Sequence, residues 1–365
     1  MIKVHAAVAS QSLIFDLDFA SLERDLEKWG EQKYRARQIW QGLYHNLWDR
    51  TEQFSTLPIY LRQKLTEAYR FSNLSPSLSL NSIDGETSKT LFILPDGKAV
   101  EAVLMQYEKR RTVCISTQAG CAMGCVFCAT GQMGFQRNLS SGEIVEQVLY
   151  YARQLKERDE QVTNIVIMGM GEPLHNYEAT MRAIDQLNDP QGYNFGARRI
   201  TVSTVGLVPA IRKFTSEKRQ VNLAISLHAA DDELRSSLLP INRKYPLNDL
   251  LQACQEYVKL THRRLSFEWA LIQGVNDSIE QAVKLAKLLN IFRQEDGAIL
   301  CHVNVIPLNP TNKYSGQATT HKRAQEFQKV LAIHGIPCTI RIRRGIDIQA
   351  GCGQLATRAK SSESD

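Results

Sequence analysis

The spacing of apolar residues changes along the chain, and the change separates two kinds of structure. Between residues 17 and 72, apolar residues recur at every third or fourth position, which predicts amphipathic helices. From residue 111 onward, short apolar runs alternate with longer amphipathic segments. Strands and helices that alternate in this way are typical of a parallel sheet with right-handed crossovers. The pattern therefore predicts an α/β fold that follows a small helical domain.

The helical part divides into three predicted helices, at residues 18–30, 33–48 and 57–71. The middle helix mixes aromatic side chains with arginines, so it could contact RNA by stacking on bases and binding phosphates. A helical bundle with tryptophan in its core explains the same pattern, and both interpretations stay open. Residues 73–82 are polar and rich in Ser and Pro, which favours a linker or a surface loop.

The α/β part follows a predicted β-hairpin at residues 90–107 with a Pro-Asp-Gly turn. Its expected strands are 111–116, 163–169, 198–204, 221–227, 265–272 and 301–307, with a last strand at 338–343. Six βα units are too few to close an eight-stranded barrel, so we expect a partial (β/α)6 barrel. In such sheets the chemistry lies at the carboxyl ends of the strands.

This pattern suggests a division of the chain into four regions. We expect a helical accessory domain at 1–75, a linker with a β-hairpin at 76–110, the partial barrel with a C-terminal loop at 111–355, and a flexible tail at 356–365.

Composition narrows the class of protein. Of the 365 residues, 43% are hydrophobic and 22% charged, as in an ordinary globular protein, and the net charge of +6 fits either a nucleic-acid partner or a solvated basic surface. No run of about 18 apolar residues predicts a membrane span, and the N-terminus lacks the sustained apolar stretch of a signal peptide. We therefore expect a cytoplasmic protein. There, clustering among its eight cysteines indicates metal binding or catalysis rather than stable disulfides.

The strongest chemical signal is a group of three cysteines directly after the first barrel strand. Cys121, Cys125 and Cys128 form a C-x3-C-x2-C array. Thiolates suit iron–sulfur clusters and zinc, and three thiolates on a four-iron cluster leave one iron open to a substrate. A zinc site with a distant fourth ligand is the alternative. Phe127 precedes the third cysteine, where an aromatic ring could shield a cluster.

This array and its context resemble the radical S-adenosylmethionine (SAM) superfamily. The resemblance implies that SAM chelates the open iron of a 4Fe-4S cluster and is cleaved to a 5′-deoxyadenosyl radical. The sequence MGMGEPLHN at the second strand end resembles the motif that binds the SAM amino group, with Gly171 and Glu172 as contacts. Further candidate contacts follow the third, fourth and sixth strands: Ser203, Ser226, Leu227, His228 and Asn309.

Two other cysteines lie where they could meet at the strand-end face. Cys114 is on the strand before the cluster loop, and Cys352 lies between two glycines after the last strand. A pair that forms a transient disulfide is plausible. A small buried hydrophobe is the simpler interpretation of a lone cysteine, and it suits the three cysteines within predicted elements: Cys254, Cys301 and Cys338.

Several motifs in order resemble one family closely. They are ISTQAGCAMGCVFCATGQMGFQRNL, GMGEPLHN, ISLHA, PINRKYPL, GVND, VNVIPLNP and GIDIQAGCGQL, from about Glu101 to Leu355. Together they resemble the dual-specificity RNA adenine-2 methyltransferases. The resemblance implies methylation of carbon 2 of an adenosine in 23S rRNA, at the peptidyl transferase centre, and in tRNA next to the anticodon. It also implies an RNA-contacting N-terminal domain, an electron donor such as flavodoxin, and a monomer.

The same resemblance assigns catalytic roles residue by residue. Cys352 takes a methyl group from one SAM, and the radical from a second SAM removes a hydrogen from that methyl. The resulting methylene radical adds to the adenine, which joins enzyme and RNA covalently. Cys114 then forms a disulfide with Cys352 and frees the base. Glu101 matches the position of the proton acceptor, and an exposed strand carboxylate is the alternative.

Recognition of RNA requires that the target adenine leave its stack, which is cheap in a loop. Basic residues that could hold the backbone, or that could be merely solvated, are Arg137, Arg198, Arg199, Arg243, Arg341, Arg343 and Arg344.

Three other functions compete with this interpretation. A related resistance enzyme methylates carbon 8 of the same rRNA adenine through the same two cysteines, although Pro173 favours the carbon-2 type. A metal-stabilised RNA-binding module without catalysis would leave Glu172, Cys114 and Cys352 unexplained. A radical SAM enzyme that does not act on RNA would fit the barrel and the cluster, but it would not explain the pair of Cys114 and Cys352.

Overall fold

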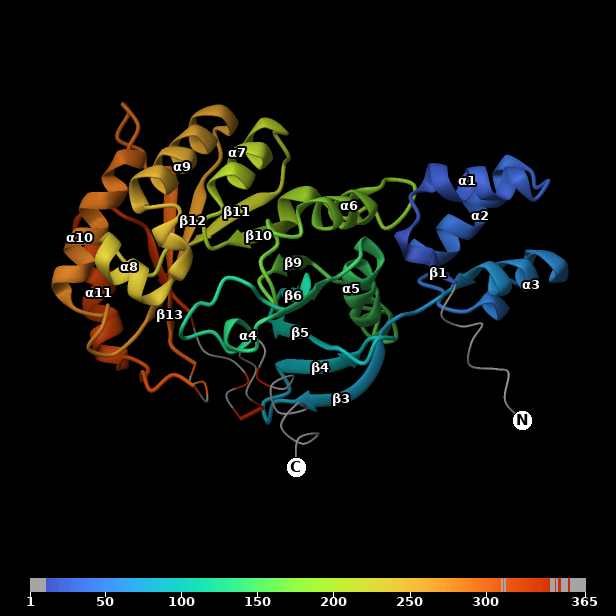
Figure 1. Ribbon diagram of the computed structural model, residues 1–365, viewed down its shortest axis with the longest axis horizontal. Coiled ribbons are helices and arrows are strands. Elements are labelled where there is room, and N and C mark those ends of the chain that lie inside the picture. The colour runs from blue at the N-terminus through green and yellow to red at the C-terminus, as the bar shows by residue number, and fades with distance from the viewer. Residues whose placement is uncertain are drawn as a thin grey trace.

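The computed structural model describes residues 11–309, 311, 313–341, 345, 347, 348 and 354. Cys352, Arg343, Arg344 and the predicted tail at 356–365 lie outside the described residues. A sheet of ten strands forms the centre of the protein, and the N-terminal helices lie at one end of it (Figure 1).

The three predicted N-terminal helices are confirmed. They are α1 (Phe19–Lys28), α2 (Lys33–Tyr44) and α3 (Ile59–Ala68), and two short parallel strands, β1 (Ser12–Leu13) and β2 (Tyr69–Arg70), join the ends of this region. Short 3-10 helices lie at Ile14–Asp16 and Thr51–Gln53. The side chain of Asp18 accepts a hydrogen bond from the backbone N–H of Ser21, which caps α1.

The aromatic residues of α2 mostly form a core. Trp40 and Tyr44 are buried with their ring centroids 4.5 Å apart, and the Trp40 indole N–H donates to Asp189 at 2.8 Å. Tyr34, in contrast, is 54% exposed beneath the Arg35 guanidinium. The tryptophan-core interpretation is therefore confirmed for Trp40, while Tyr34 stays available to a partner.

The sheet has an antiparallel part and a parallel part. The antiparallel strands are β3 (Ser75–Asn81), β4 (Thr87–Ile93) and β5 (Ala99–Tyr107), and β5 pairs with β6 (Arg110–Cys114). The parallel strands follow in chain order: β6, β9 (Asn164–Ile167), β10 (Ile200–Thr204), β11 (Asn222–Ser226), β12 (Leu265–Leu271), β13 (Cys301–Pro307) and β14 (Cys338–Ile340). The predicted partial barrel and hairpin are thus confirmed.

The expected linker at 73–82 is wrong. Residues 75–81 form β3, which pairs with β4 through a bulge between Pro76 and Leu78. Leu78 and Leu80 alternate with polar residues in β3, but only Leu80 is partly buried against the core and the other six residues are exposed. The short alternation is therefore masked by the Ser- and Pro-rich composition around it. The place of β3 at the edge of the sheet explains why a loop-like composition forms a strand there.

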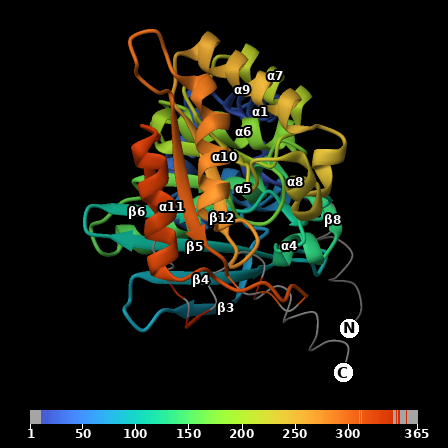
Figure 2. The ribbon, with the colours of Figure 1, turned by 90° about the vertical axis from the view of Figure 1, so that its left-hand side faces the viewer.

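Helices cover the outer face of the parallel strands. They are α5 (Ser141–Lys156), α6 (Tyr177–Asn188), α7 (Val208–Ser216), α8 (Asp232–Leu238), α9 (Leu247–Thr261), α10 (Ile279–Leu289) and α11 (His321–Ile333). Short 3-10 helices lie at Ala197–Arg199, Pro240–Arg243 and Asn290–Phe292. Figure 2 shows α10 and α11 on the outside of the sheet, near β12. None of the described helices is long and apolar enough to cross a membrane.

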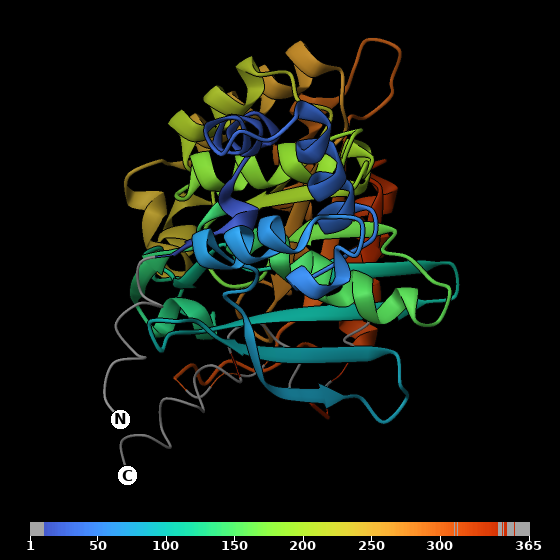
Figure 3. The ribbon, with the colours of Figure 1, turned by 90° about the vertical axis from the view of Figure 1, so that its right-hand side faces the viewer.

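The N-terminal region docks on α5 and α6 (Figure 3). The Gly142 N–H at the start of α5 donates to Asp16 at 2.7 Å, and the Gln186 amide of α6 donates to the carbonyls of Phe15 and Leu17. A Cβ on Gly142 would lie 2.7 Å from Leu13 and from the Phe15 backbone, so only glycine allows this close approach.

Candidate active site

The cluster loop lies between β6 and α5 and is held by its own small sheet. Strands β7 (Gln118–Gly120) and β8 (Phe135–Asn138) pair on either side of it, and a short helix, α4 (Ala129–Gln132), follows the last cysteine. Gly120 has φ +72°, and a Cβ there would lie 1.9 Å from the Gly134 carbonyl oxygen. The Cys121 N–H donates to the same carbonyl at 3.1 Å. These contacts fix where the first cysteine enters the loop.

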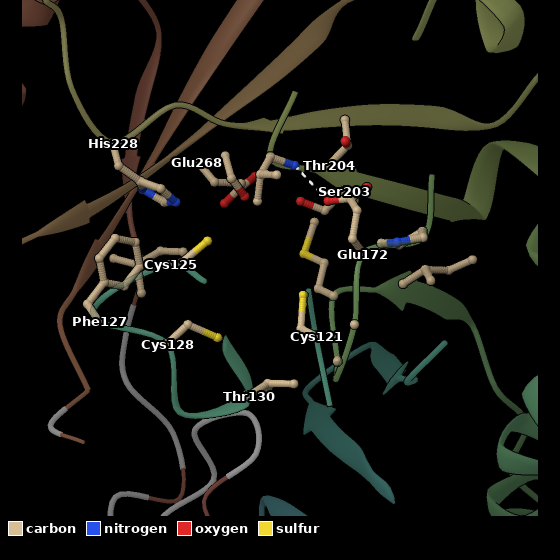
Figure 4. A pocket seen from close by; sticks show the side chains of 18 residues that line it. Cys121, Cys125, Phe127, Cys128, Thr130, Glu172, Ser203, Thr204, His228 and Glu268 are labelled. Atoms are coloured by element: carbon tan, nitrogen blue, oxygen red, sulfur yellow. Dashed lines mark hydrogen bonds between the residues drawn. The ribbon is translucent and has the colours of Figure 1, made fainter. Parts of the chain in front are cut away.

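The three cysteines face a cavity of about 230 Å³ at the carboxyl ends of the parallel strands. Figure 4 shows their sulfur atoms pointing toward one another, with Glu172, Glu268 and His228 across the space. The lining residues are Cys121, Cys125, Phe127, Cys128, Thr130, Ile167, Met168, Gly169, Gly171, Glu172, Pro173, Ser203, Thr204, Val205, Ser226, His228, Glu268 and Ile306. The structure therefore brings most of the predicted site residues to one place.

An apolar shell surrounds the thiols. Cys125 packs in a cluster with Leu238 and Leu239, and Phe127 packs against it with its ring 5.0 Å from the His228 ring. Burial raises the pKa of the Cys121 thiol to about 12 and that of Cys125 well above its ordinary value. Buried thiols in a dry shell suit a cluster that must be protected from water.

The arrangement of the three thiols agrees with a cluster. Cys121, Cys125 and Cys128 line one side of a single cavity whose other described walls carry no further cysteine. Three thiolates around such a space can bind three irons of a four-iron cluster and leave the fourth open toward the cavity. The three thiols therefore fit a 4Fe-4S cluster.

Glu172 is held with its carboxylate at the cavity wall. Its two oxygens accept hydrogen bonds from the backbone N–H groups of Leu174 at 3.0 Å and Val205 at 2.9 Å. The residue is 2% exposed, and burial raises the pKa of the carboxyl to about 7 although these hydrogen bonds oppose the rise. A fixed, buried carboxylate of this kind suits a cationic partner.

Gly171 gives that carboxylate its place. It has φ +101°, and a Cβ would lie 2.6 Å from the Gln118 Cβ and 2.8 Å from the Gln118 backbone nitrogen. The Gln118 side-chain oxygen accepts a hydrogen bond from the Glu172 N–H at 2.8 Å. The turn therefore packs directly on β7, the strand that leads into the cluster loop.

The other predicted SAM contacts divide into two groups. Ser203 and Ser226 line the cavity at the ends of β10 and β11, and His228 lines it just beyond. Leu227 is fully buried, and its N–H donates to the Glu268 carbonyl at 3.0 Å. Asn309 lies beyond β13 and is not among the cavity-lining residues. The structure thus gathers three of these five at the cavity.

His228 is held in one chemical form. Its Nδ1 accepts a hydrogen bond from the Ala270 N–H at 2.9 Å, and burial lowers the pKa of the imidazole to about 3. The ring is therefore neutral and carries its proton on Nε2, which makes that nitrogen a donor. The backbone has φ +61°, so a specific contact is needed to hold it.

Two residues that hold the backbone around His228 and the neighbouring strand ends were not singled out from the sequence. Asn276 donates to the carbonyls of His228 at 2.8 Å and Ala270 at 2.7 Å, and it lies in the GVND motif that carried only a family resemblance. Arg235 is fully buried and donates to carbonyls of Val205 and Leu227, at the ends of β10 and β11. Arg235 has no local signal in the sequence, because it binds backbone atoms at the ends of two other elements. Asn276 binds Ala270 and Ile272 in its own turn, and only its contact with His228 is distant in the sequence.

Glu268 is a further cavity residue that the sequence did not single out. It lies on β12 in register with Ser226, and its carboxylate accepts a hydrogen bond from the Asn304 amide at 2.8 Å. Burial raises the pKa of this carboxyl above its ordinary value. Its position on the inner face of the barrel was the available signal, because a carboxylate in a strand of apolar residues needs a partner.

Cys114 and Glu101 lie on the same inner face, beside this cavity. Glu101 is not an exposed carboxylate, as the simpler interpretation held, because its side chain is 2% exposed and forms an ion pair with Lys89 at 2.7 Å. Cys114 is in register with Val166 of β9, and its thiol has a hydrogen bond with the backbone of Met168, which lines the cavity.

The remaining cysteines and arginines behave in part as expected. Cys254 and Cys301 are fully buried and Cys338 is half-buried, as small hydrophobes would be. Arg137 forms ion pairs with Asp96 at 2.6 Å and Glu143 at 2.7 Å, so it braces the cluster loop. The other described arginines of the predicted RNA-binding set are exposed: Arg198, Arg199, Arg243 and Arg341.

Comparison with known proteins gives consistent matches. Residues 115–286 match the Radical SAM superfamily, and residues 13–70 match the Ribosomal RNA large subunit methyltransferase N-terminal domain. The "Probable dual-specificity RNA methyltransferase RlmN" of Chloroflexus aurantiacus is 49% identical over 95% of this chain and 93% of its own. The "Dual-specificity RNA methyltransferase RlmN 1" of Myxococcus xanthus is 48% identical over 94% of this chain and 93% of its own.

A solved structure agrees with the sequence matches. The crystal structure of a radical SAM methyltransferase from Sphaerobacter thermophilus has a TM-score of 0.90 and 50% identity, over 94% of this chain and 98% of that one. The predicted fold, and the predicted cofactors, a 4Fe-4S cluster and SAM, are confirmed at the level of the family. Nearly half of all positions are shared across almost the whole length, so this chain belongs to the RlmN family of radical SAM RNA methyltransferases.

Proposed function

We propose that this protein methylates carbon 2 of an adenosine in 23S rRNA, at the peptidyl transferase centre, and in tRNA next to the anticodon. The route is a methylated cysteine followed by a transient disulfide. The observation that carries the proposal is the position of Cys114, whose thiol contacts Met168 at the edge of the cavity into which three other thiols point. A cysteine beside the cluster cavity but outside the cluster array is what a release step by disulfide formation requires.

The cavity residues supply the binding of the cofactors. Cys121, Cys125 and Cys128 would hold three irons of the cluster, and Glu172 would accept hydrogen bonds from the amino group of SAM. When bound, the cluster and SAM supply a one-electron cleavage that produces a radical able to take hydrogen from an unreactive C–H bond. Phe127 and the apolar residues around Cys125 would exclude water from that step.

Other residues would orient SAM in the same cavity. Ser203 and Ser226 present hydroxyl groups at adjacent strand ends, and the neutral His228 presents a donor. Gly171 allows the backbone of its turn to approach closely, and Leu227 would shape the wall through its backbone. Asn309, just beyond β13, would reach SAM from the far side of the barrel opening.

The chain's own nucleophiles perform the transfer. Cys352 would carry the methyl group, because carbon 2 of adenine is electron-poor and cannot itself attack a methyl donor. Glu101 would take the proton that leaves this carbon, and Cys114 would attack the sulfur of Cys352 to release the product. Cys352 lies outside the described residues, and β14, the last described strand before it in the chain, ends at the same edge of the sheet as the cavity.

The RNA would approach the strand-end face with its target adenine out of the stack. The exposed arginines Arg198, Arg199, Arg243 and Arg341, together with Arg343 and Arg344, are candidates for contacts to phosphates. Tyr34 on α2 presents an exposed ring for stacking in the N-terminal domain, with the Arg35 guanidinium against it. We place the reaction in the cytoplasm, with a monomeric enzyme and a flavodoxin-like electron donor.

Labelling of Cys352 tests this route directly. The cluster-loaded enzyme is incubated with SAM that carries a deuterated methyl group, and its cysteine-containing peptides are analysed by mass spectrometry. The label should appear on Cys352, and a Cys352→Ala variant should neither take up label nor methylate RNA. A Cys338→Ala variant is the control, because Cys338 is a half-buried strand residue with no proposed role. Product formation by Cys352→Ala would contradict the proposed route.

A further inference from the structure

A buried ion pair lies on the inner face of the antiparallel strands. The Lys89 ammonium is 2.7 Å from the Glu101 carboxylate, and the two side chains are 0% and 2% exposed. Burying two charges is costly, and apolar residues of similar size would often be at least as stable there. The pair is therefore better explained by what it does than by the stability that it adds.

The strand register brings this pair close to Cys114. Lys89 of β4 is opposite Val103 of β5, and Val103 is opposite Cys114 of β6. Glu101 precedes Val103 by two residues, so its side chain points to the same face of the sheet. Lys89, Glu101 and Cys114 are thus neighbours on one surface, although they come from three strands.

Glu101 is also connected to the SAM-binding turn. Its carbonyl oxygen accepts a hydrogen bond from the Ser116 hydroxyl at 2.6 Å, and that hydroxyl accepts one from the Met170 N–H at 2.8 Å. A shift of the Glu101 backbone would therefore move Ser116 and, through it, Met170 in the SAM-binding turn. Whatever fixes the Glu101 side chain also helps to fix the geometry between the proton acceptor and the bound cofactor.

The groups around the Cys114 thiol shift its pKa in opposite directions. Burial raises the pKa of this thiol to about 12, even though the residue keeps some exposed surface. The hydrogen bond with the Met168 backbone and the positive charge of Lys89 both act to lower it, and the negative charge of Glu101 acts to raise it, with the smaller effect. Tyr151 of α5, on the opposite face of the sheet, is neutral and donates to Thr90 and to a backbone carbonyl.

We propose that Lys89 is a positioning residue for the release step, which holds Glu101 beside Cys114 and stabilises the thiolate of Cys114 that breaks the covalent adduct with RNA. This proposal rests on the proposed function. The thiolate attacks the sulfur of Cys352, and the new S–S bond forms as the bond between that sulfur and the methylene carbon breaks. The electron pair of the broken bond passes to the methylene carbon, which takes a proton and becomes the methyl group. The disulfide is later reduced by an external thiol.

The test measures the ionisation of Cys114 without RNA. In cluster-loaded enzyme kept without oxygen, the rate of alkylation of Cys114 by iodoacetamide is followed against pH by peptide mass spectrometry. Lys89→Met should move the midpoint upward by roughly one pH unit or more, a ~10-fold slower reaction at a given pH. Glu101→Gln should move it downward. Lys284→Met removes the same charge at an exposed helical site and should leave the profile unchanged.

A purely structural role for Lys89 would give a different result. Loss of packing would change Cys114 in the same direction in both single variants, whereas the electrostatic account predicts opposite directions. If Lys89→Met does not fold, the double variant Lys89→Met/Glu101→Gln distinguishes the two roles, because it leaves no unpaired charge buried. Its midpoint should lie above that of Glu101→Gln, because the two variants differ only in the positive charge of Lys89, which lowers the pKa of Cys114.

Two outcomes would overturn the proposal. An unchanged alkylation profile in Lys89→Met, or a double variant with the same profile as Glu101→Gln, would remove the role of Lys89 while leaving the methyltransferase reaction intact. Absence of 2-methyladenosine from the natural enzyme would instead overturn the proposed function and the release step with it. On the RNA itself, Lys89→Met should accumulate covalent adduct on a denaturing gel at pH 7, and raising the pH should relieve that accumulation.

Discussion

Replacing Gly171 by alanine should disconnect the SAM-binding turn from the cluster loop. The residue has φ +101°, and the added Cβ would lie 2.6 Å from the Gln118 Cβ and 2.8 Å from its backbone nitrogen. The backbone conformation alone costs an L-residue about 1–3 kcal/mol, and forcing a methyl group into a closed space costs about 1–3 kcal/mol more. The backbone nitrogen of Gln118 cannot move aside as the end of a flexible side chain could.

The strain at Gly171 should weaken SAM binding through Gln118 and Glu172. The Glu172 N–H donates to the Gln118 side chain at 2.8 Å, so a displaced Gln118 takes the Glu172 carboxylate out of place. Loss of one hydrogen bond between charged groups costs about 1.5–3 kcal/mol, which is a ~10–100-fold loss of SAM affinity.

Calorimetric titration with SAM and thermal unfolding measure the two effects. The matched control is Gly297→Ala, where φ is +83° but nothing lies within 4 Å of the added Cβ. It should lose about 1 kcal/mol of stability and no SAM affinity. If Gly171→Ala bound SAM as tightly as Gly297→Ala does, the proposed link between the turn and Glu172 would be wrong.

Three other changes have defined outcomes. Asn276→Ala should lower stability by about 2–3 kcal/mol and weaken SAM binding, because the His228 carbonyl loses its buried donor; denaturant unfolding and titration measure both. Burial raises the pKa of Glu146 to about 7, so the folded state holds this proton more tightly than the unfolded state and stability should fall as the pH rises from about 4.5 to 7. Glu146→Gln should therefore stabilise the protein by up to about 3 kcal/mol at pH 8 and by little at pH 4.5 in thermal unfolding; equal gains at both values would contradict this. Cys114→Ala should leave enzyme covalently trapped on RNA on a denaturing gel, and normal turnover without adduct would refute the release step.

The sequence predicted those elements whose pattern reflects burial on one side or both. Strand β13 has the predicted bounds, 301–307, because apolar residues alternate with His302 and Asn304 along it, and such alternation is a strong local signal for a strand. Strand β3 was missed because its Ser- and Pro-rich composition is that of a loop, and because its order comes mainly from pairing with β4. Pairing between strands is a long-range property that the local composition of residues 75–81 does not contain.

The candidate site divides in the same way. The cluster cysteines, Glu172 and the strand-end serines were predictable, because parallel strands bring their carboxyl ends to one edge. The burial of Glu101 was not predictable, because its partner Lys89 lies on a different strand and only the register reveals it. The role of Arg235 at the cavity was equally hidden, because it reaches the strand ends through the carbonyls of Val205 and Leu227, which any sequence would supply.

The identity of the methylated nucleoside tests the central claim most directly. The cluster is reconstituted without oxygen, and the enzyme is given SAM, a reductant and an unmodified 23S rRNA fragment before the RNA is digested for mass spectrometry. We expect 2-methyladenosine from the natural enzyme and none from a Cys352→Ala control. An 8-methyladenosine product would contradict the carbon-2 assignment. Cleavage of SAM without any methylation of the RNA would contradict the proposed rRNA substrate.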